Sequence, residues 1–203
     1  MKLAVLGATG RTGRLVVQQA LAAGHHVRVL VRSPTKLGIT NAQLEVLTGD
    51  ATDAAAVRTL VQDRDAVISA LGPAPGRVDV CSTATKHVIA AGAKRYVAVS
   101  GAGLDVPGDQ KDLPGKIVSF FVRKLSPAIF ADKVLEHQLL ASSSLSWTLV
   151  RPPRLTDASK TAKAKSSLLN AQGSSISRAQ LAAFTLECAA DGSLIGKAPF
   201  VSG

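Results

Sequence analysis

Short apolar segments alternate along the chain with longer segments in which apolar residues recur every three or four positions. The first kind has the length of a buried strand, and the second is typical of an amphipathic helix. We predict strands at residues 2–6, 26–31, 44–48, 65–69, 95–99 and 146–150, with a short edge strand at 198–201. We predict helices at 15–23, from about 54 to 62, and at 80–91, 116–124, 129–141 and 178–190, the last capped by Ser177. This alternation indicates an α/β fold, a doubly wound parallel sheet in three layers.

The first strand runs directly into the turn Gly7-Ala-Thr-Gly10-Arg-Thr-Gly13, which opens the first helix. A glycine turn between a strand and a helix is typical of a dinucleotide-binding βαβ unit, although this spacing is a variant of the G-x-G-x-x-G pattern. The free N–H groups and the dipole of such a helix favour phosphates. The alternative is a purely structural tight turn. The residues predicted to contact the cofactor here are Gly7, Thr9, Gly10, Arg11, Thr12 and Gly13.

The second strand ends at Arg32, about 20 residues beyond the glycine turn. A site that prefers NAD places a carboxylate there for the ribose 2′-hydroxyl, whereas an arginine binds a 2′-phosphate. Arg32 therefore favours NADP(H) over NAD(H), with Arg11 adding positive charge; the alternative is a solvated arginine at a strand end. The loop that follows adds Ser33, Thr35 and Lys36 to the predicted phosphate site.

Two further strand ends belong to the predicted adenosine side of the site. Asp50 and Ala51 follow the third strand, and the Asp50 carboxylate could accept a hydrogen bond from the adenine amino group. Either Thr52 or Asp53 is expected to cap the next helix. Leu71 and Gly72 follow the fourth strand and are predicted to line the cofactor site, although a Gly-Pro turn is also ordinary loop chemistry.

Composition narrows the class of protein. At 203 residues we expect a single domain over residues 1–203. No apolar run is long enough to cross a bilayer and no signal peptide is recognisable, so we expect a cytoplasmic protein without a membrane partner. Lys and Arg exceed Asp and Glu by 24 to 14, a net charge of +10 that favours anionic ligands. The basic residues are scattered and aromatic residues make up only 3%, so we expect no specific nucleic acid. Cys81 and Cys188 have no metal-ligand or redox spacing, and we predict no metal site.

Two polar segments interrupt the alternation of strands and helices. The first runs from Asp105 to Pro114 and is predicted to be a loop. The second, from Leu155 to Ser175, carries Lys160, Lys163 and Lys165 and is predicted to be a flexible lid or loop over the site.

Five motifs occur in one order over nearly the whole chain: the glycine turn, Val31-Arg32, Gly49-Asp50, Val99-Ser100-Gly101 and Trp147-Thr-Leu-Val-Arg-Pro-Pro153. This set resembles the atypical short-chain dehydrogenase/reductases, in particular the NmrA-like group and the small NADPH-dependent flavin reductases of the biliverdin reductase B type. The resemblance implies a Rossmann fold with the nicotinamide near Ser100, Lys133, Pro153 and Arg154. It also implies that a small lobe, residues 104–132 and 153–176, builds the pocket for a small-molecule acceptor.

The chain departs from the standard family at its catalytic tyrosine. The family uses Tyr-x-x-x-Lys, but Ile129 stands four positions before Lys133, and Tyr96, the one tyrosine, lies inside the fifth strand. Gly101 holds the place of a serine that flavin-reductase relatives can carry, so Ser100 and Lys133 are the remaining catalytic candidates. Hydride transfer to an isolated carbonyl needs a proton donor, whereas a flavin or similar conjugated acceptor delocalises the charge.

The sequence thus favours an NADPH-dependent reductase of a flavin or similar conjugated acceptor. The alternative is a non-catalytic NADP(H)-binding sensor of the NmrA-like kind. Lys133 and His137 share a helix face with Glu136, where Lys133 could bind the nicotinamide ribose and His137 could donate a proton. The alternative for both is a solvated, self-paired helix surface. Trp147 is predicted to belong to the core.

Overall fold

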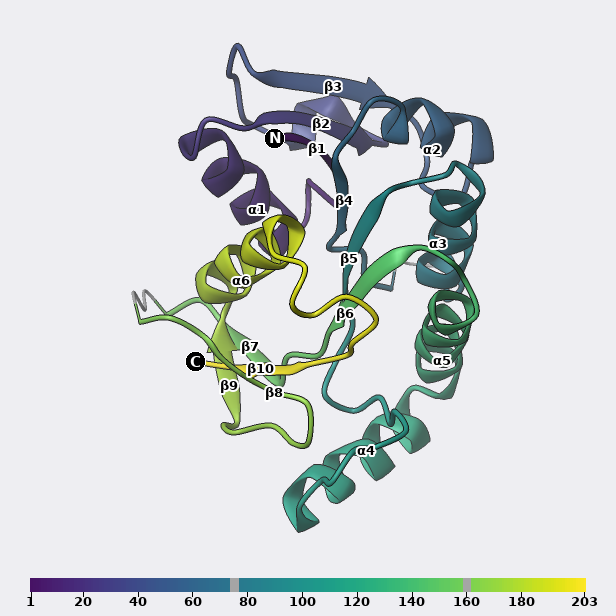
Figure 1. Ribbon diagram of the computed structural model, residues 1–203, viewed down its shortest axis with the longest axis vertical. Coiled ribbons are helices and arrows are strands. Elements are labelled where there is room, and N and C mark those ends of the chain that lie inside the picture. The colour runs from purple at the N-terminus through teal and green to yellow at the C-terminus, as the bar shows by residue number, and fades with distance from the viewer. Residues whose placement is uncertain (74–76, 159–161) are drawn as a thin grey trace.

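A computed structural model describes residues 1–73, 77–158 and 162–203 and is built around one six-stranded parallel sheet (Figure 1). The strands are β1 (Lys2–Leu6), β2 (His26–Val31), β3 (Leu44–Thr48), β4 (Ala66–Ser69), β5 (Arg95–Val99) and β6 (Ser146–Val150). Their order in the sheet is β3-β2-β1-β4-β5-β6, so the direction of winding reverses between β1 and β4. Open α/β sheets bind their ligands at such a reversal, beside the carboxyl ends of the strands. All six predicted strands are confirmed, the fourth beginning one residue later than predicted.

Helices cover both faces of the sheet, which confirms the three-layer α/β fold (Figure 1). Alternate residues of the strands point to opposite faces, so Leu3 and Val5 pack toward one core while Ala4 and Leu6 pack toward the other. One face carries α1 (Arg11–Ala22) and α6 (Arg178–Ala190), and the other carries α2 (Ala54–Val61), α3 (Val80–Ala90) and α5 (Pro127–Ala141). Trp147 is buried in the second core, as predicted. A short 3-10 helix, η1 (Pro34–Lys36), follows β2.

The helix boundaries follow from local capping. Asp53 caps α2, since its carboxylate accepts hydrogen bonds from the N–H groups of Ala55 and Ala56, which decides between the two predicted candidates. Ser177 caps α6 in a reciprocal capping box with Gln180. The helix predicted at 116–124 begins earlier, as α4 (Leu113–Leu125), because Asp112 caps it and a proline occupies the first turn.

The small lobe beside β6 contains more regular structure than the predicted flexible lid. Residues 155–175 take part in three short strands, so the prediction of an irregular lid was wrong for those segments; Lys160 lies outside the described residues. Backbone pairing within the lobe and with the C-terminal strand supplies the order that side-chain polarity alone did not indicate. The elements are β7 (Arg154–Thr156), β8 (Lys165–Ser167), β9 (Ser175–Ser177) and β10 (Phe200–Ser202), paired as β7 with β9 and β8 with β10. Among the described residues, no helix is long and apolar enough to cross a membrane.

A buried arginine joins three separate segments at the end of β6. The Arg151 guanidinium makes two hydrogen bonds of 2.7 Å to the Asp109 carboxylate, and it lies 3.8 Å from the centroid of the Phe200 ring. Arg151 also donates to the backbone carbonyl groups of Leu104 and Ala198. Only 1% of Arg151 is exposed, so this bidentate charge pair connects the loop after β5, the end of β6 and β10 within the interior.

We expect an Asp109→Ala substitution to lower the free energy of unfolding by about 3–5 kcal/mol, because it leaves the Arg151 charge buried without its partner. Equilibrium unfolding in urea measures this change. Glu45→Ala is a control: it removes a half-exposed carboxylate that pairs with Arg28 at 2.7 Å. It should cost no more than about 1 kcal/mol, because Arg28 keeps its hydrogen bonds to the carbonyl groups of Thr59 and Gln62. Equal losses in the two variants would contradict the assigned role of Arg151.

Candidate functional site

Two adjoining cavities follow the carboxyl edge of the sheet across the point where the winding reverses. The larger has a volume of about 970 Å³ and the smaller about 220 Å³. Both are lined by the turn after β4, residues 70–73. Together they form an elongated cleft, with the glycine turn along the smaller cavity and the small lobe around the larger one.

The glycine turn leaves room for a ligand because side chains are excluded from it. Gly7 has a φ of +77°, and a Cβ at that position would lie 2.7 Å from the Ala70 carbonyl group. A Cβ on Gly13 would come within 2.1 Å of the Gly7 carbonyl oxygen, so only glycine lets α1 pack this closely on β1. The helix begins at Gly10 with no side-chain cap, and the first N–H groups of α1 are therefore available to an anion. This cradle fits the pyrophosphate of a dinucleotide.

Arg32 and Asp50 lie together on the smaller cavity, as the sequence predicts for the adenosine side. Hydrogen bonds from the backbone and the hydroxyl group of Thr52 hold the pKa of the Asp50 carboxyl below its ordinary value, so the group is ionised at neutral pH. The sequence analysis missed Arg77, which also lines this cavity and donates a 2.9 Å hydrogen bond to the Thr52 hydroxyl. Its position in a turn with no recognisable motif offered no signal.

The predicted site residues divide between the two cavities. The smaller cavity is lined by Gly7, Thr9, Gly10, Arg32, Asp50, Ala51, Leu71 and Gly72. The larger is lined by Thr12, Leu71, Gly72, Ser100, Lys133, Pro153 and Arg154. Gly13 is buried in the helix packing.

Four predicted phosphate contacts do not line either cavity. Ser33, Thr35 and Lys36 lie at and within η1, which a 2.6 Å hydrogen bond from Arg14 to the Lys36 carbonyl oxygen holds beside α1. Arg11 forms an ion pair with Asp157 of the small lobe. Asp157 also pairs with a second arginine, on α6, so the cation of Arg11 is engaged at the rim of the cleft.

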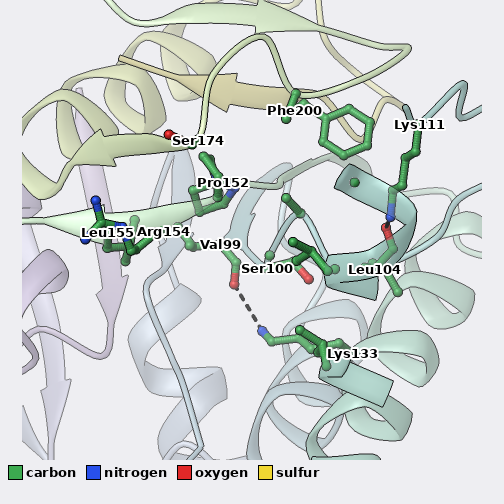
Figure 2. A pocket seen from close by; sticks show the side chains of 18 of the residues that line it. Val99, Ser100, Leu104, Lys111, Lys133, Pro152, Arg154, Leu155, Ser174 and Phe200 are labelled. Atoms are coloured by element: carbon green, nitrogen blue, oxygen red, sulfur yellow. Dashed lines mark hydrogen bonds between the residues drawn. The ribbon is translucent and has the colours of Figure 1, made fainter. Parts of the chain in front are cut away.

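The walls of the larger cavity come from segments that lie far apart in the chain (Figure 2). Ser100 follows β5, and Lys133 of α5 reaches the same strand end; Arg154 and Leu155 lie on one side of the cavity, and Lys111 and Phe200 on the other. Most of the lining side chains are apolar, and helix α4 contributes Val118 and Val122. Residues of both predicted pocket segments, 104–132 and 153–176, line the cavity. Phe200 was not predicted, because a lone phenylalanine in a C-terminal strand carries no signal of a site.

Lys133 holds a positive charge at the base of this cavity. Its ammonium group donates to the Val99 carbonyl oxygen at 3.0 Å (Figure 2). It also donates to the Glu136 carboxylate at 2.9 Å. Burial lowers the pKa of Lys133, but the charge of the buried Glu136 outweighs it, and the net pKa lies above the ordinary lysine value. The other Glu136 oxygen accepts a hydrogen bond from Thr85 at 3.3 Å. The pair is therefore a buried ion pair on the cavity floor, and the alternative of a solvated helix surface is wrong for Lys133.

The other candidate proton donors lie apart from the cavity or at its edge. Tyr96 is fully buried, with its hydroxyl 3.1 Å from that of Thr85, and burial raises its pKa. His137 packs edge-on against Trp147 and is not among the residues that line the cavity. The Ser100 hydroxyl is buried and has no hydrogen-bond partner among the described residues, although Ser100 lines the cavity. A buried hydroxyl without a partner is costly, so this oxygen fits a ligand's polar group.

Neither cysteine suggests redox or metal chemistry. Burial raises the pKa of Cys81 to about 11 and that of Cys188 to about 12, so both thiols are protonated at neutral pH. Among the described residues, no cluster of three or more His, Cys, Asp or Glu side chains could hold a metal ion.

Comparisons with known proteins agree with this geometry. A family model described as NAD(P)H-binding matches residues 7–192. The uncharacterised protein YwnB of Bacillus subtilis is 28% identical over 161 residues, which cover 77% of this chain and 74% of that protein. A putative NADH-flavin reductase from Streptococcus pneumoniae shares the fold, with a TM-score of 0.81, 24% identity and coverage of 100% of this chain and 99% of that chain. The anaerobillin reductase ChuY from Escherichia coli O157:H7 has a TM-score of 0.80 at 23% identity, with coverage of 100% and 97%. A short-chain dehydrogenase/reductase from Veillonella parvula, solved in complex with NADP, has a TM-score of 0.78 at 16% identity, with coverage of 100% and 94%.

We expect Glu136→Gln to cost about 3 kcal/mol of unfolding free energy at neutral pH, because the Lys133 ammonium then stays buried without a counter-charge. In the unmodified protein the raised pKa of Lys133 gives a stabilisation that is full at neutral pH and is lost as the pH rises above about 10. In the variant burial acts unopposed, the pKa of Lys133 falls below its ordinary value, and stability rises from neutral toward alkaline pH. Urea unfolding at a series of pH values measures both profiles.

The double variant Lys133→Met with Glu136→Leu is the matched control for this pair. Removing both charges should recover most of the lost stability, since a buried ion pair contributes little against apolar groups of similar size. Parallel pH profiles for Glu136→Gln and the unmodified protein would show that the two charges are not coupled.

Proposed function

The chain belongs to the NAD(P)H-binding family, and we propose that it is an NADPH-dependent reductase of flavins or similarly conjugated acceptors. The observation that carries the proposal is the cleft itself. A glycine cradle for a dinucleotide opens into a large apolar cavity that has a lysine cation and a serine hydroxyl at its base but no tyrosine among its lining residues. Apolar walls with a few convergent polar groups are typical of small-molecule sites.

The smaller cavity would hold the adenosine and pyrophosphate of the cofactor, and the larger cavity would hold its nicotinamide. The uncapped N-terminus of α1 would hold the pyrophosphate, and Asp50 and Ala51 would face the adenosine. Lys133 would bind the nicotinamide ribose, and the Ser100 hydroxyl would meet the polar edge of the nicotinamide. The bound cofactor supplies the two electrons of the reduction as a hydride.

A preference for NADPH over NADH follows from the charges around the smaller cavity. Arg32 and Arg77 both line it, and the position where an NAD site carries an acid is occupied by Arg32. A guanidinium group binds a phosphate through two parallel hydrogen bonds. We assign the 2′-phosphate to Arg32, with Arg77 as a second cation.

The nature of the acceptor follows from the absence, among the cavity-lining residues, of the tyrosine that acts as general acid in the standard family. Tyr96 is engaged with Thr85 inside the core, and Ile129 lines the cavity where the family's tyrosine would stand. Reduction of an isolated carbonyl would create an alkoxide without a proton donor. A flavin or a comparable conjugated ring system delocalises the added charge and takes its proton from water. The protein then acts mainly by holding the acceptor against the nicotinamide.

The absence of the catalytic tyrosine also favours a second candidate, a sensor that binds NADP(H) but does not catalyse its oxidation. It would use the same glycine cradle and the same arginines. The two candidates differ in a single measurable property, oxidation of the bound cofactor by an acceptor.

We expect the purified protein to oxidise NADPH when it is mixed with FMN, FAD, riboflavin, biliverdin or a quinone, followed by the loss of NADPH absorbance. Tyr96→Phe should keep the rate within about twofold, because this hydroxyl lies in the core, whereas Lys133→Met should lower it by about tenfold or more. Tight binding of NADPH with no oxidation by any acceptor would reject the reductase in favour of the sensor.

We expect Arg32→Ala to weaken NADPH binding by about 10- to 100-fold, since a hydrogen-bonded contact to a charged group contributes about 1.5–3 kcal/mol. Binding of NADH should change little, because NADH has no 2′-phosphate. Titration of cofactor fluorescence measures both affinities. Arg64→Ala, an arginine outside both cavities, is the matched control, and an Arg32→Ala variant with unchanged NADPH affinity would overturn the phosphate assignment.

A further inference from the structure

Helix α4 projects from the end of the molecule remote from β3 (Figure 1). It presents apolar side chains to solvent. Leu113 is 71% exposed, Phe121 is 53% exposed and Leu125 is 78% exposed. Ile117 and Phe120 are each about half exposed. Solvent-exposed apolar groups gathered on one element mark an interaction surface.

These apolar residues are distinct from those that face the cavity. The neighbouring side of α4 carries Pro114, Val118 and Val122, which line the larger cavity and are themselves exposed to solvent. Ser119, the one buried residue of the helix, accepts a 2.8 Å hydrogen bond from Lys111 and anchors the helix to the lobe. Leu113, Ile117, Phe120, Phe121 and Leu125 are not among the cavity-lining residues, so we call them the outer face of α4.

The charges on this helix have one sign. Lys116, Arg123 and Lys124 are exposed, and α4 contains no acidic residue. At 100° per residue, Lys116 and Lys124 flank Phe120 on the helix surface. The acids of the preceding loop are already engaged: Asp112 caps α4, Asp105 pairs with Lys111, and Asp109 pairs with Arg151. The outer face therefore combines aromatic and aliphatic groups with cations that have no ion-pair partner among the described residues.

We propose that the outer face of α4 docks in the surface of an anionic lipid bilayer. A helix that lies in the interface buries aromatic and aliphatic side chains at the level of the headgroups, while its lysine and arginine side chains extend to the lipid phosphates. The net charge of +10 adds a long-range attraction of the same sign.

A second copy of the chain is a poorer occupant for this surface. A symmetric contact through α4 would bring the same three cations of each copy to one interface, and α4 offers no carboxylate to pair with them. A negatively charged bilayer supplies a hydrocarbon environment for the apolar side chains of the outer face and anions to pair with its cations.

The proposal departs from the expectation of no membrane partner, which rested on the absence of a spanning segment. Residues 116–124 have the pattern of any amphipathic helix, and only the fold shows that the outer face is left uncovered. The position of α4 also has a consequence that rests on the proposed function: the helix that would lie in the bilayer is a wall of the acceptor cavity, so an apolar acceptor dissolved in the lipid would enter beside it.

The test is co-sedimentation of the full chain, without cofactor, with vesicles of phosphatidylcholine alone and with vesicles that contain roughly one third phosphatidylserine. We expect binding to the anionic vesicles, with weaker binding as salt is added. The triple variant K116E/R123E/K124E should lose about 100-fold in apparent affinity, since each cation near an anionic surface contributes about fivefold. The pair Phe120→Ser with Phe121→Ser should also release the protein.

The matched control is R58E/K86E/K94E, which makes the same change in net charge at exposed positions outside α4. It should keep most of the binding. Equal loss in both triple variants would overturn the proposal in favour of nonspecific attraction, and failure of the unmodified chain to bind anionic vesicles would overturn it directly. A dimer in sedimentation velocity that the two Phe→Ser changes dissociate would assign the face to a second copy instead.

Failure of the bilayer proposal and failure of the reductase proposal are distinguishable. The vesicle measurement contains no cofactor or acceptor, and the charge-reversal variants leave every cavity-lining residue in place. Oxidation of NADPH by a water-soluble acceptor should therefore proceed equally in K116E/R123E/K124E and in the unmodified chain.

Discussion

The buried charge pair between Arg151 and Asp109 is the interaction on which the acceptor side of the cleft depends. The central sheet folds from segments that follow one another closely in the sequence, but the cavity beyond it is assembled from segments far apart. Arg151 reaches the loop after β5 through Asp109 and the C-terminal strand through Phe200. With 1% of the arginine exposed, no water replaces either contact. A buried arginine charge is unfavourable unless it is paired. Arg151 therefore keeps the loop after β5, the end of β6 and β10 together.

A second buried charge pair, between Lys133 and Glu136, lies at the base of the larger cavity. Glu136 is fully buried beneath Lys133, and the pair compensates itself while the ammonium group also reaches the Val99 carbonyl oxygen. Because the counter-charge lies below the cavity floor, the cation faces the space where a ligand would bind. Arg32 and Arg77 line the smaller cavity, and the uncapped α1 helix adds its own positive end. Each cavity thus presents cations to a ligand, alongside the carboxylates of Asp50 in the smaller cavity and Asp112 in the larger one, whose other lining residues are mostly apolar.

The small lobe is where the chain leaves its apolar groups least covered. Helix α4 is held by its cap at Asp112 and by the contact of Ser119 with Lys111, while Leu113 and Leu125 at its ends extend into solvent. The central sheet shows the opposite arrangement, with Leu3 and Val5 buried by helices on one face and Ala4 and Leu6 on the other. The exposed face of α4 is both apolar and basic, and the same helix lines the larger cavity.

The sequence by itself determined the layers of the fold and placed the glycine turn, Arg32 and Asp50 at the smaller cavity. Strand and helix periodicities are local, the Gly7 to Gly13 turn is contiguous, and Arg32 follows at a distance that the βαβ unit sets. Only the tertiary structure decided the rest. Arg77 and Phe200 reach the cleft from segments without a motif, and Arg11 pairs with Asp157, 146 positions away in the sequence. Polar residues 155–175 contain short strands because β8 pairs with β10 and β7 pairs with β9. These contacts join segments that are far apart in the sequence, and they depend on which charged groups the fold brings together. The local pattern of apolar and polar residues does not contain this information.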